Sequence, residues 1–168
     1  MRNRTAMFVI AILGANIGAG TAFAVDPASS ATVIGAEPLL TQGADEMLSE
    51  RWQQGIEHTE QGLTAAIDSS QRAAAYSNLC AAYVAIGDFD HALASCDQSL
   101  KLDTTNWRTY NNRAGALLGK GRIDEALHDI ETGIAIAPLA DTLRKTESIV
   151  RNRLKNLYAP RRQAAAAS

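Results

Sequence analysis

Residues 73–106, AAAYSNLCAAYVAIGDFDHALASCDQSLKLDTTN, are followed directly by residues 107–140, WRTYNNRAGALLGKGRIDEALHDIETGIAIAPLA. The two stretches align with each other without a gap, at an offset of 34 residues. Equivalent positions hold Tyr76 and Tyr110, Asn78 and Asn112, Gly87 and Gly121, and Ala92 and Ala126. Self-similarity at a fixed period of about 20–50 residues is typical of a chain that stacks copies of one structural unit.

Each stretch has the apolar spacing of two helices. In residues 73–106 the first helix is indicated by apolar residues at i, i+3, i+4 and i+7. These residues are Tyr76, Leu79, Cys80 and Tyr83. Gly87 then permits the left-handed backbone that ends a helix, and Asp88 is suited to cap the next one. The second apolar face follows at Phe89, Leu93, Cys96 and Leu100. The pattern therefore predicts an all-α fold built from helical hairpins.

These positions resemble the tetratricopeptide repeat (TPR) family. Residues 73–106 match its preferred residue types at Tyr76, Leu79, Cys80, Tyr83 and Ala92, and residues 107–140 match them at Tyr110, Ala114, Ala126 and Pro138. The departures are Cys96, Ser99 and Thr104 in the first stretch and Arg113, Leu117, Ile130 and Gly133 in the second. The resemblance implies a solenoid in which the first helix of each repeat lines a concave surface.

The flanking sequence extends the same pattern. Residues 38–72 are interpreted as a degenerate repeat, whose second helix is indicated by Trp52, Ile56, Thr59 and Leu63, with Gly55 and Gly62 at the small positions. Residues 141–158 are amphipathic and predict a helix that caps the exposed edge of the last repeat. We expect residues 159–168 to be a disordered tail. The predicted architecture is about three repeats and a C-terminal capping helix.

The chain begins with the three parts of a secretory signal. Arg2 and Arg4 give a positive start, residues 6–20 are almost wholly apolar, and small residues flank Phe23 before a cleavage site expected after Ala24. Residues 1–24 are therefore interpreted as a signal peptide, which predicts a periplasmic or secreted protein.

A flexible leader is expected at residues 25–37, which lack periodicity. The alternative to cleavage is an N-terminal membrane anchor, because the apolar stretch approaches the about 20 residues that a spanning helix needs. If the signal is removed, we expect no stable membrane insertion.

Cys80 and Cys96 are the two cysteines of the chain. They fall on the facing helices of one repeat, at levels that should lie opposite each other, and an exported protein reaches a compartment that permits disulfides. We expect them to form a disulfide that staples this repeat. The alternative is two free thiols that serve as small core residues.

Composition and motifs argue against several classes of function. The chain has 16 Lys and Arg and 18 Asp and Glu, without a basic stripe in its body, so nucleic acid is not the expected partner. The three histidines, His58, His91 and His128, have no metal-ligand spacing. No nucleophile motif or phosphate-binding loop occurs. We therefore expect a protein that is not an enzyme and holds no cofactor or metal.

By the resemblance, a bound peptide would contact the first helices of the repeats. The candidates are Ser77, Asn78, Ala81, Arg108, Asn111, Asn112 and Gly115, which we call the groove residues. The amides are suited to hydrogen-bond an extended peptide backbone, and Arg108 to pair with a carboxylate. The alternative is that the Asn side chains tie neighbouring helices together.

The function expected from the sequence is a non-catalytic module that binds a protein or peptide partner in the concave groove. Two alternatives remain. One is a structural accessory protein that self-associates through an exposed repeat edge, and the other is a membrane-tethered scaffold with an uncleaved N-terminus.

Overall fold

The structure is a computed structural model that describes residues 37–65 and 67–166, with side chains as far as residue 159. The described part is all-helical. Its elements are α2 (Pro38–Leu48), α3 (Trp52–Gly62), α4 (Ser69–Ile86), α5 (Phe89–Leu102), α6 (Trp107–Gly119), α7 (Ile123–Ile136) and α8 (Asp141–Ala166). The predicted signal peptide and all but the last residue of the predicted leader lie outside the described residues.

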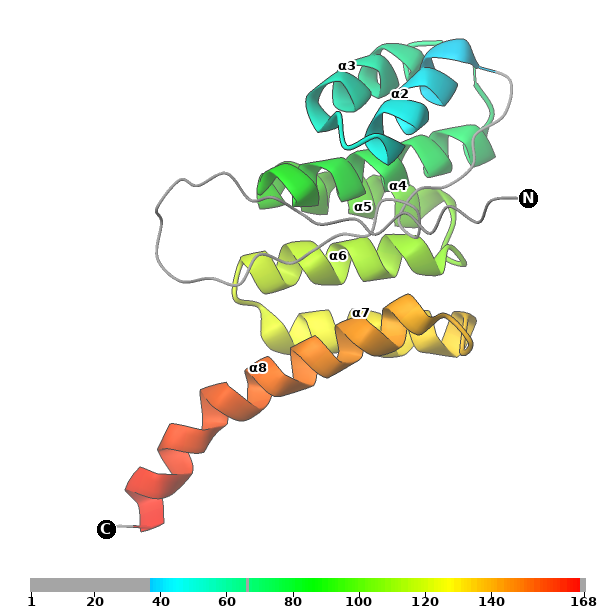
Figure 1. Cartoon of the computed structure of the whole chain (residues 1–168). Coiled ribbons are helices and arrows are strands. Elements are labelled where there is room, and N and C mark those ends of the chain that lie inside the picture. Colours follow the sequence, from blue (N-terminus) through cyan, green and yellow to red (C-terminus); the bar gives the residue numbers. More distant parts are fainter. Residues whose placement is uncertain (1–36, 66, 167–168) are drawn as a thin grey trace, which may run out of the picture.

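Three helical hairpins, α2–α3, α4–α5 and α6–α7, stack on one another, and α8 packs mainly on α7 (Figure 1). The first helices of successive hairpins also lie side by side, since α4 contacts both α2 and α6. This arrangement confirms the predicted all-α, TPR-like solenoid with a helix at its C-terminal edge.

The turns within the second and third hairpins depend on glycine. Gly87 has a φ of 82° and Gly121 a φ of 73°, the left-handed region that a side chain disfavours. Asp88 caps α5 by accepting a hydrogen bond from the backbone N–H of His91. At the start of α4, Asp68 and Gln71 form a reciprocal capping box. The chain therefore reverses direction at the two places that the repeat pattern indicates.

The first hairpin holds its helices together at glycines. A Cβ added to Gly43 would lie 2.3 Å from the Thr59 hydroxyl oxygen and 2.9 Å from the Gly55 carbonyl oxygen. A Cβ added to Gly62 would lie 2.6 Å from a methyl carbon of Leu40. Real side chains essentially never come so close, so α2 and α3 approach each other at a distance that only glycine permits.

The second hairpin has a covalent link at its centre. The sulfur atoms of Cys80 on α4 and Cys96 on α5 are bonded, and the two Cα atoms are 5.2 Å apart. Both cysteines are fully buried, as is Ala92 beside them. The small residues at these positions allow the close contact of the two helices.

The last helix differs from the prediction at its end. Leu143 and Val150 are fully buried against the repeats, as expected of a capping helix. The predicted end at residue 158 is wrong, because α8 continues to Ala166. Residues 164–166 are all alanine, which has the highest helix propensity and so favours continuation of the helix. No helix of the described residues is long and apolar enough to span a bilayer.

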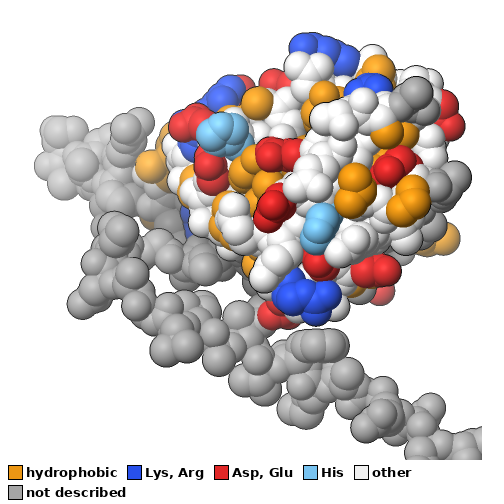
Figure 2. Space-filling view, turned by 90° about the horizontal axis from the view of Figure 1, so that it is seen from above, with side chains coloured by type: hydrophobic (Ala, Val, Ile, Leu, Met, Phe, Trp, Pro, Cys, Tyr) orange, Lys and Arg blue, Asp and Glu red, His pale blue; other side chains and the backbone are white. Residues whose placement is uncertain are grey.

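The surface over α2 and α3 is of mixed polarity. On the face above α2 and α3, hydrophobic side chains are scattered among acidic, histidine and neutral polar side chains (Figure 2). Scattered apolar residues of this kind are normal on a protein surface and need no partner to cover them.

Candidate functional site

The groove residues lie on two neighbouring helices. Ser77, Asn78 and Ala81 lie on α4, and Arg108, Asn111, Asn112 and Gly115 lie on α6. Six of the seven are buried, and Arg108 is half-buried in the first turn of α6. The structure therefore brings these residues together at the contact of two repeats and does not present them as an open surface.

A buried chain of hydroxyl groups joins three helices at this contact. The Thr109 hydroxyl on α6 donates a hydrogen bond of 2.9 Å to the Ser77 hydroxyl on α4. Ser99 on α5 lies 3.1 Å from the Thr109 hydroxyl and donates to the Ala73 carbonyl oxygen on α4. Every member of the chain is buried, so the bonds hold the helices in register without competition from water.

Asn111 points toward the C-terminal helix. Its side-chain oxygen accepts a hydrogen bond of 2.8 Å from the hydroxyl of Thr146 on α8, and both residues are buried. This contact matches the alternative that the sequence left open, in which an Asn side chain ties neighbouring helices together. In the structure, Asn111 holds the capping helix to α6.

Arg108 and Asn112 lie one turn apart on the same side of α6. The side-chain N–H₂ of Asn112 donates to the Ser77 carbonyl oxygen at 3.4 Å. Its side-chain oxygen is buried without a hydrogen-bond partner, and so is the Nε of Arg108. The guanidinium of Arg108 stacks over the Trp107 ring at 4.5 Å. This face of α6 thus offers one unmet donor and one unmet acceptor, the pair of groups that a peptide backbone complements.

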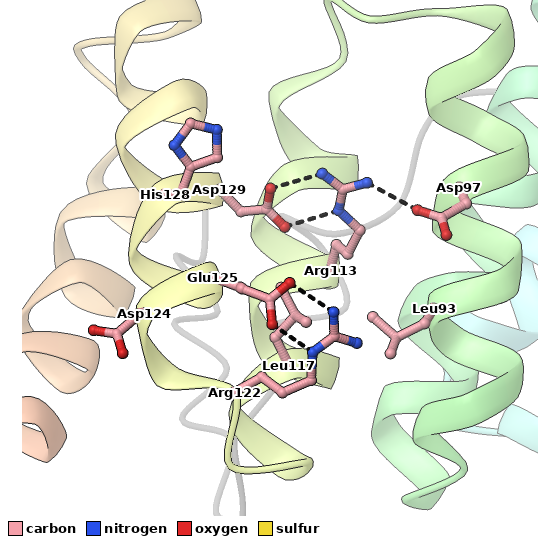
Figure 3. Close-up of a pocket in the computed structure, with 9 residues that line it drawn as sticks. All are labelled: Leu93, Asp97, Arg113, Leu117, Arg122, Asp124, Glu125, His128 and Asp129. Carbon is pink, nitrogen blue, oxygen red and sulfur yellow. Dashed lines mark hydrogen bonds and ion pairs between the residues drawn. The ribbon is translucent and has the colours of Figure 1, made fainter. Parts of the chain in front are cut away.

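A second feature is a hollow of about 420 Å³ between α5, α6 and α7 (Figure 3). It is lined by Leu93, Asp97, Arg113, Leu117, Arg122, Asp124, Glu125, His128 and Asp129. Arg113 donates two hydrogen bonds to Asp129, of 2.8 and 2.7 Å, and a third of 2.8 Å to Asp97. These carboxylates raise the pKa of Arg113 above its ordinary value, the bonds to Asp129 contributing most.

The charges around this hollow are largely satisfied within the protein. Arg122 donates two hydrogen bonds of 2.6 Å to Glu125, and they lower the pKa of that carboxyl group. Arg113, Asp97 and Asp129 are already joined to one another. Within the described residues, no three His, Cys, Asp or Glu side chains gather closely enough to hold a metal ion. The hollow is therefore an ion-paired seam between repeats.

Several residues at these contacts were not among the sequence candidates. Thr109 and Thr146 gave no signal, because a lone Thr on an amphipathic helix is ordinary. Arg113 did give one, since it stands where the repeat pattern prefers Leu. Its partner Asp129 is 16 residues away on the next helix, and only the structure shows that the two side chains meet.

No family model matches the chain. Mouse sperm-associated antigen 1 is 29% identical over 93 residues, which cover 55% of this chain and 10% of that protein. A small glutamine-rich tetratricopeptide repeat-containing protein 2 from Mycosarcoma maydis is 31% identical over 70 residues, which cover 42% of this chain and 20% of that protein. The matched part of the chain therefore spans a fifth or less of these relatives.

Solved structures resemble the fold more completely. The Hsp90 co-chaperone Cns1 from Saccharomyces cerevisiae superposes with a TM-score of 0.71 at 18% identity, covering 78% of this chain and 43% of that one. The second TPR domain of human RPAP3, solved with the HSP70 peptide SGPTIEEVD, has a TM-score of 0.59 at 24% identity and covers 66% and 89%. The first TPR of Spaghetti, solved with the HSP90 peptide SRMEEVD, has a TM-score of 0.63 at 18% identity and covers 69% and 90%. The described part of this chain has the fold of a TPR domain.

Proposed function

We propose that this protein is a non-catalytic interaction module that binds a peptide segment of another protein along the α4–α6 face. The observation that carries the proposal is the pair of unmet polar atoms, Arg108 Nε and Asn112 Oδ1, one turn apart on α6. An unmet buried donor or acceptor costs about 1–3 kcal/mol. A peptide carbonyl and a peptide N–H would relieve both costs at once.

A ligand can reach these atoms only if the contact between α4 and α6 opens locally. Asn112 has no exposed surface, and Ser77 beside it has none either. A ligand that binds only the opened form has an apparent affinity lowered by the fraction of molecules that are open. We therefore expect modest affinity for isolated peptides, and variants that favour opening should bind more tightly.

The similar structures support this choice of ligand class. The RPAP3 and Spaghetti domains were each solved with a short peptide, and both peptides end in the acidic sequence EEVD. Among the groove residues of this chain, Arg108 is the one basic side chain. We therefore propose that recognition rests on the peptide backbone, with at most one ion pair, and that the partner need not carry an acidic terminus.

A peptide-display selection tests the proposal. Enriched peptides would be measured by fluorescence anisotropy against the wild type, the Arg108→Ala/Asn112→Ala variant and an Arg122→Ala control at the hollow between α5, α6 and α7. We expect the double variant to lose about tenfold in affinity and the control to bind as the wild type does. Equal binding by all three proteins would reject the α4–α6 face as the binding site.

We also propose that the protein is exported. Two observations support this proposal. Residues 1–24 have a positive start, an apolar stretch and then small residues, in the order of a secretory signal, and Cys80 and Cys96 form a disulfide. Protein recovered from the periplasm or medium of its host should begin at Val25 when its N-terminus is sequenced. An intact Met1 in protein recovered from the cytoplasm would refute the proposal.

A further inference from the structure

The apolar stripe of α8 continues past the repeats that cover it. Leu143 and Val150 are fully buried, Leu154 is half-buried, and Leu157 and Tyr158 are 47% and 43% exposed. These residues follow the spacing i, i+7, i+11, i+14 and i+15, which keeps them on one side of a helix. One half of the stripe therefore caps the last repeat, and the other half is bare.

The bare half stands clear of the repeat stack. Figure 1 shows the C-terminal half of α8 pointing away from the hairpins. All residues from Lys155 to Ala159 are exposed. The helix from Lys155 to Ala166 is 12 residues long, or about 18 Å at the usual rise. A hollow of about 350 Å³ opens beside Leu154 and Tyr158.

The charge of this segment is opposite to that of the body. Residues 154–166 contain three basic residues and no acidic residue, namely Lys155, Arg161 and Arg162. Residues 37–153 contain 17 Asp and Glu against 11 Lys and Arg, a net charge of −6. An anionic surface would therefore attract the end of α8 and repel the rest of the molecule, which orients the approach.

We propose that the projecting part of α8 docks on an anionic phospholipid surface, with Leu154, Leu157 and Tyr158 below the headgroups and Lys155 among them. A helix with an apolar side flanked by a basic residue, as Leu154 and Tyr158 are by Lys155, lies in the interface in this way. Tyr158 suits the position because its ring is apolar and its hydroxyl is polar. This role is independent of peptide binding at the α4–α6 face.

Other occupants of the bare stripe fit the observations less well. A second copy of α8 would place two basic segments side by side, and like charges repel. An acidic protein groove would need a surface shaped to this helix, whereas every residue from Lys155 to Ala159 is exposed. A flat lipid surface needs no such complementarity.

Vesicle flotation of the protein as it is recovered after export tests the proposal. The vesicles would be phosphatidylcholine alone, or an equal mixture of phosphatidylcholine and phosphatidylglycerol. We expect binding to the mixed vesicles only, with a loss when salt rises from about 0.1 M to about 1 M, which shortens the screening length from about 10 Å to about 3 Å. The α8 variants must share the N-terminus of the wild type, because residues 5–24 are themselves apolar.

Two variants and one matched control separate α8 from the rest of the chain. Leu157→Ser/Tyr158→Ser and Lys155→Glu should each lower the partition coefficient about tenfold. Lys145→Glu makes the same change in net charge on an exposed position of α8 beside the repeats and should bind like the wild type. Circular dichroism of all variants should match that of the wild type, because the changed side chains are exposed.

Three outcomes would overturn the inference. The first is equal vesicle binding by the wild type and Lys155→Glu, or no binding by either. The second is a dimer in sedimentation without vesicles that Leu157→Ser/Tyr158→Ser abolishes, which would assign the stripe to a second copy. The third is saturable binding to poly-glutamate without binding to vesicles, which would assign it to an acidic polypeptide.

Discussion

The guanidinium of Arg113 on α6 forms a two-pronged ion pair with the carboxylate of Asp129 on α7, with both nitrogen–oxygen distances below 2.9 Å. The Asp129 side chain is only 3% exposed, whereas Arg113 is 25% exposed and also reaches Asp97. Arg113, which departs from the repeat pattern, thus joins α6 to α7 through Asp129 and joins the third hairpin to the second through Asp97. Because one partner is buried, the pair should matter more for stability than the exposed pairs of the surface.

Replacing Arg113 with Ala should lower the free energy of unfolding by about 3 kcal/mol, because it leaves the Asp129 carboxylate buried without a counter-ion. Urea denaturation followed by circular dichroism measures the change. Arg122→Ala is the matched control, since it removes an arginine from an exposed pair that is worth at most about 1 kcal/mol. Similar losses of unfolding free energy for the two variants would show that burial of one partner does not make an ion pair more stabilising here.

Replacing Gly43 with Ala should destabilise the protein by about 1–3 kcal/mol, although alanine is the better helix former by about 1 kcal/mol. The added methyl group would meet the Gly55 carbonyl oxygen and the backbone nitrogen of Thr59, neither of which can move without separating α2 from α3. Thermal unfolding measures the loss, with the exposed Gln54→Ala as control. A Gly43→Ala protein as stable as the wild type would refute the close approach of the two helices.

Replacing Thr146 with Val should loosen the capping helix. The change leaves the buried side-chain oxygen of Asn111 without its hydrogen bond, at a cost of about 1–3 kcal/mol. Hydrogen exchange should become faster in α8 before it does in α4 and α5, because the lost bond joins only α6 and α8. The exposed Ser148→Ala serves as control on the same helix. Unchanged exchange in α8 would mean that the hydrophobic contacts alone hold it.

Reducing the disulfide between Cys80 and Cys96 should lower the free energy of unfolding by about 3 kcal/mol, the chain-entropy value for a closed loop of about 15 residues. Urea denaturation with and without a phosphine reductant measures the difference. The oxidised protein should take up no alkylating reagent when unfolded, because both cysteines are bonded. Uptake of two alkyl groups without reduction would show two free thiols instead.

Stability should fall in acid through Glu46. The hydrogen bond with His58, of 2.7 Å, lowers the pKa of the Glu46 carboxyl group below its ordinary value of 4.5 in the folded state. A folded-state pKa that is lower than the unfolded one gives stability that is fully present above about pH 4.5 and is lost as pH falls through the folded-state pKa. Glu46→Gln should therefore show a shallower loss below pH 4.5 than the wild type or an exposed Glu50→Gln control. An identical dependence of stability on pH for all three proteins would show that the Glu46 carboxyl group does not cause the loss of stability in acid.

Much of the fold could be predicted from the sequence because it depends on local signals. The helical spacing of Tyr76 and Leu79 and the turn glycines Gly87 and Gly121 act over one or two turns of chain, and the 34-residue offset is visible in the sequence itself. All of these signals can be read without knowing what packs against them. The end of α8 could not be predicted as well, since the helix continues without a capping signal through an alanine run.

The candidate site was predictable only in part. Repeat position named Asn111 and Asn112, but position alone does not say whether an amide faces a ligand or a neighbouring helix. The structure directs Asn111 to Thr146 on α8 and leaves the Asn112 oxygen without a partner, although the two residues are adjacent in the chain. That difference arises from which helix packs over each side of α6.

The sequence by itself determined the repeating unit, its turns and its small-residue contacts, because each follows from side-chain size and backbone conformation within about 34 residues. The tertiary structure decided which polar groups meet across repeats, as in Arg113 with Asp97 and Thr109 with Ser77. It also decided where the apolar stripe of α8 stops being buried by the repeats. The physical reason is that such pairings depend on the distance and rotation between stacked hairpins, and no single hairpin's sequence specifies these.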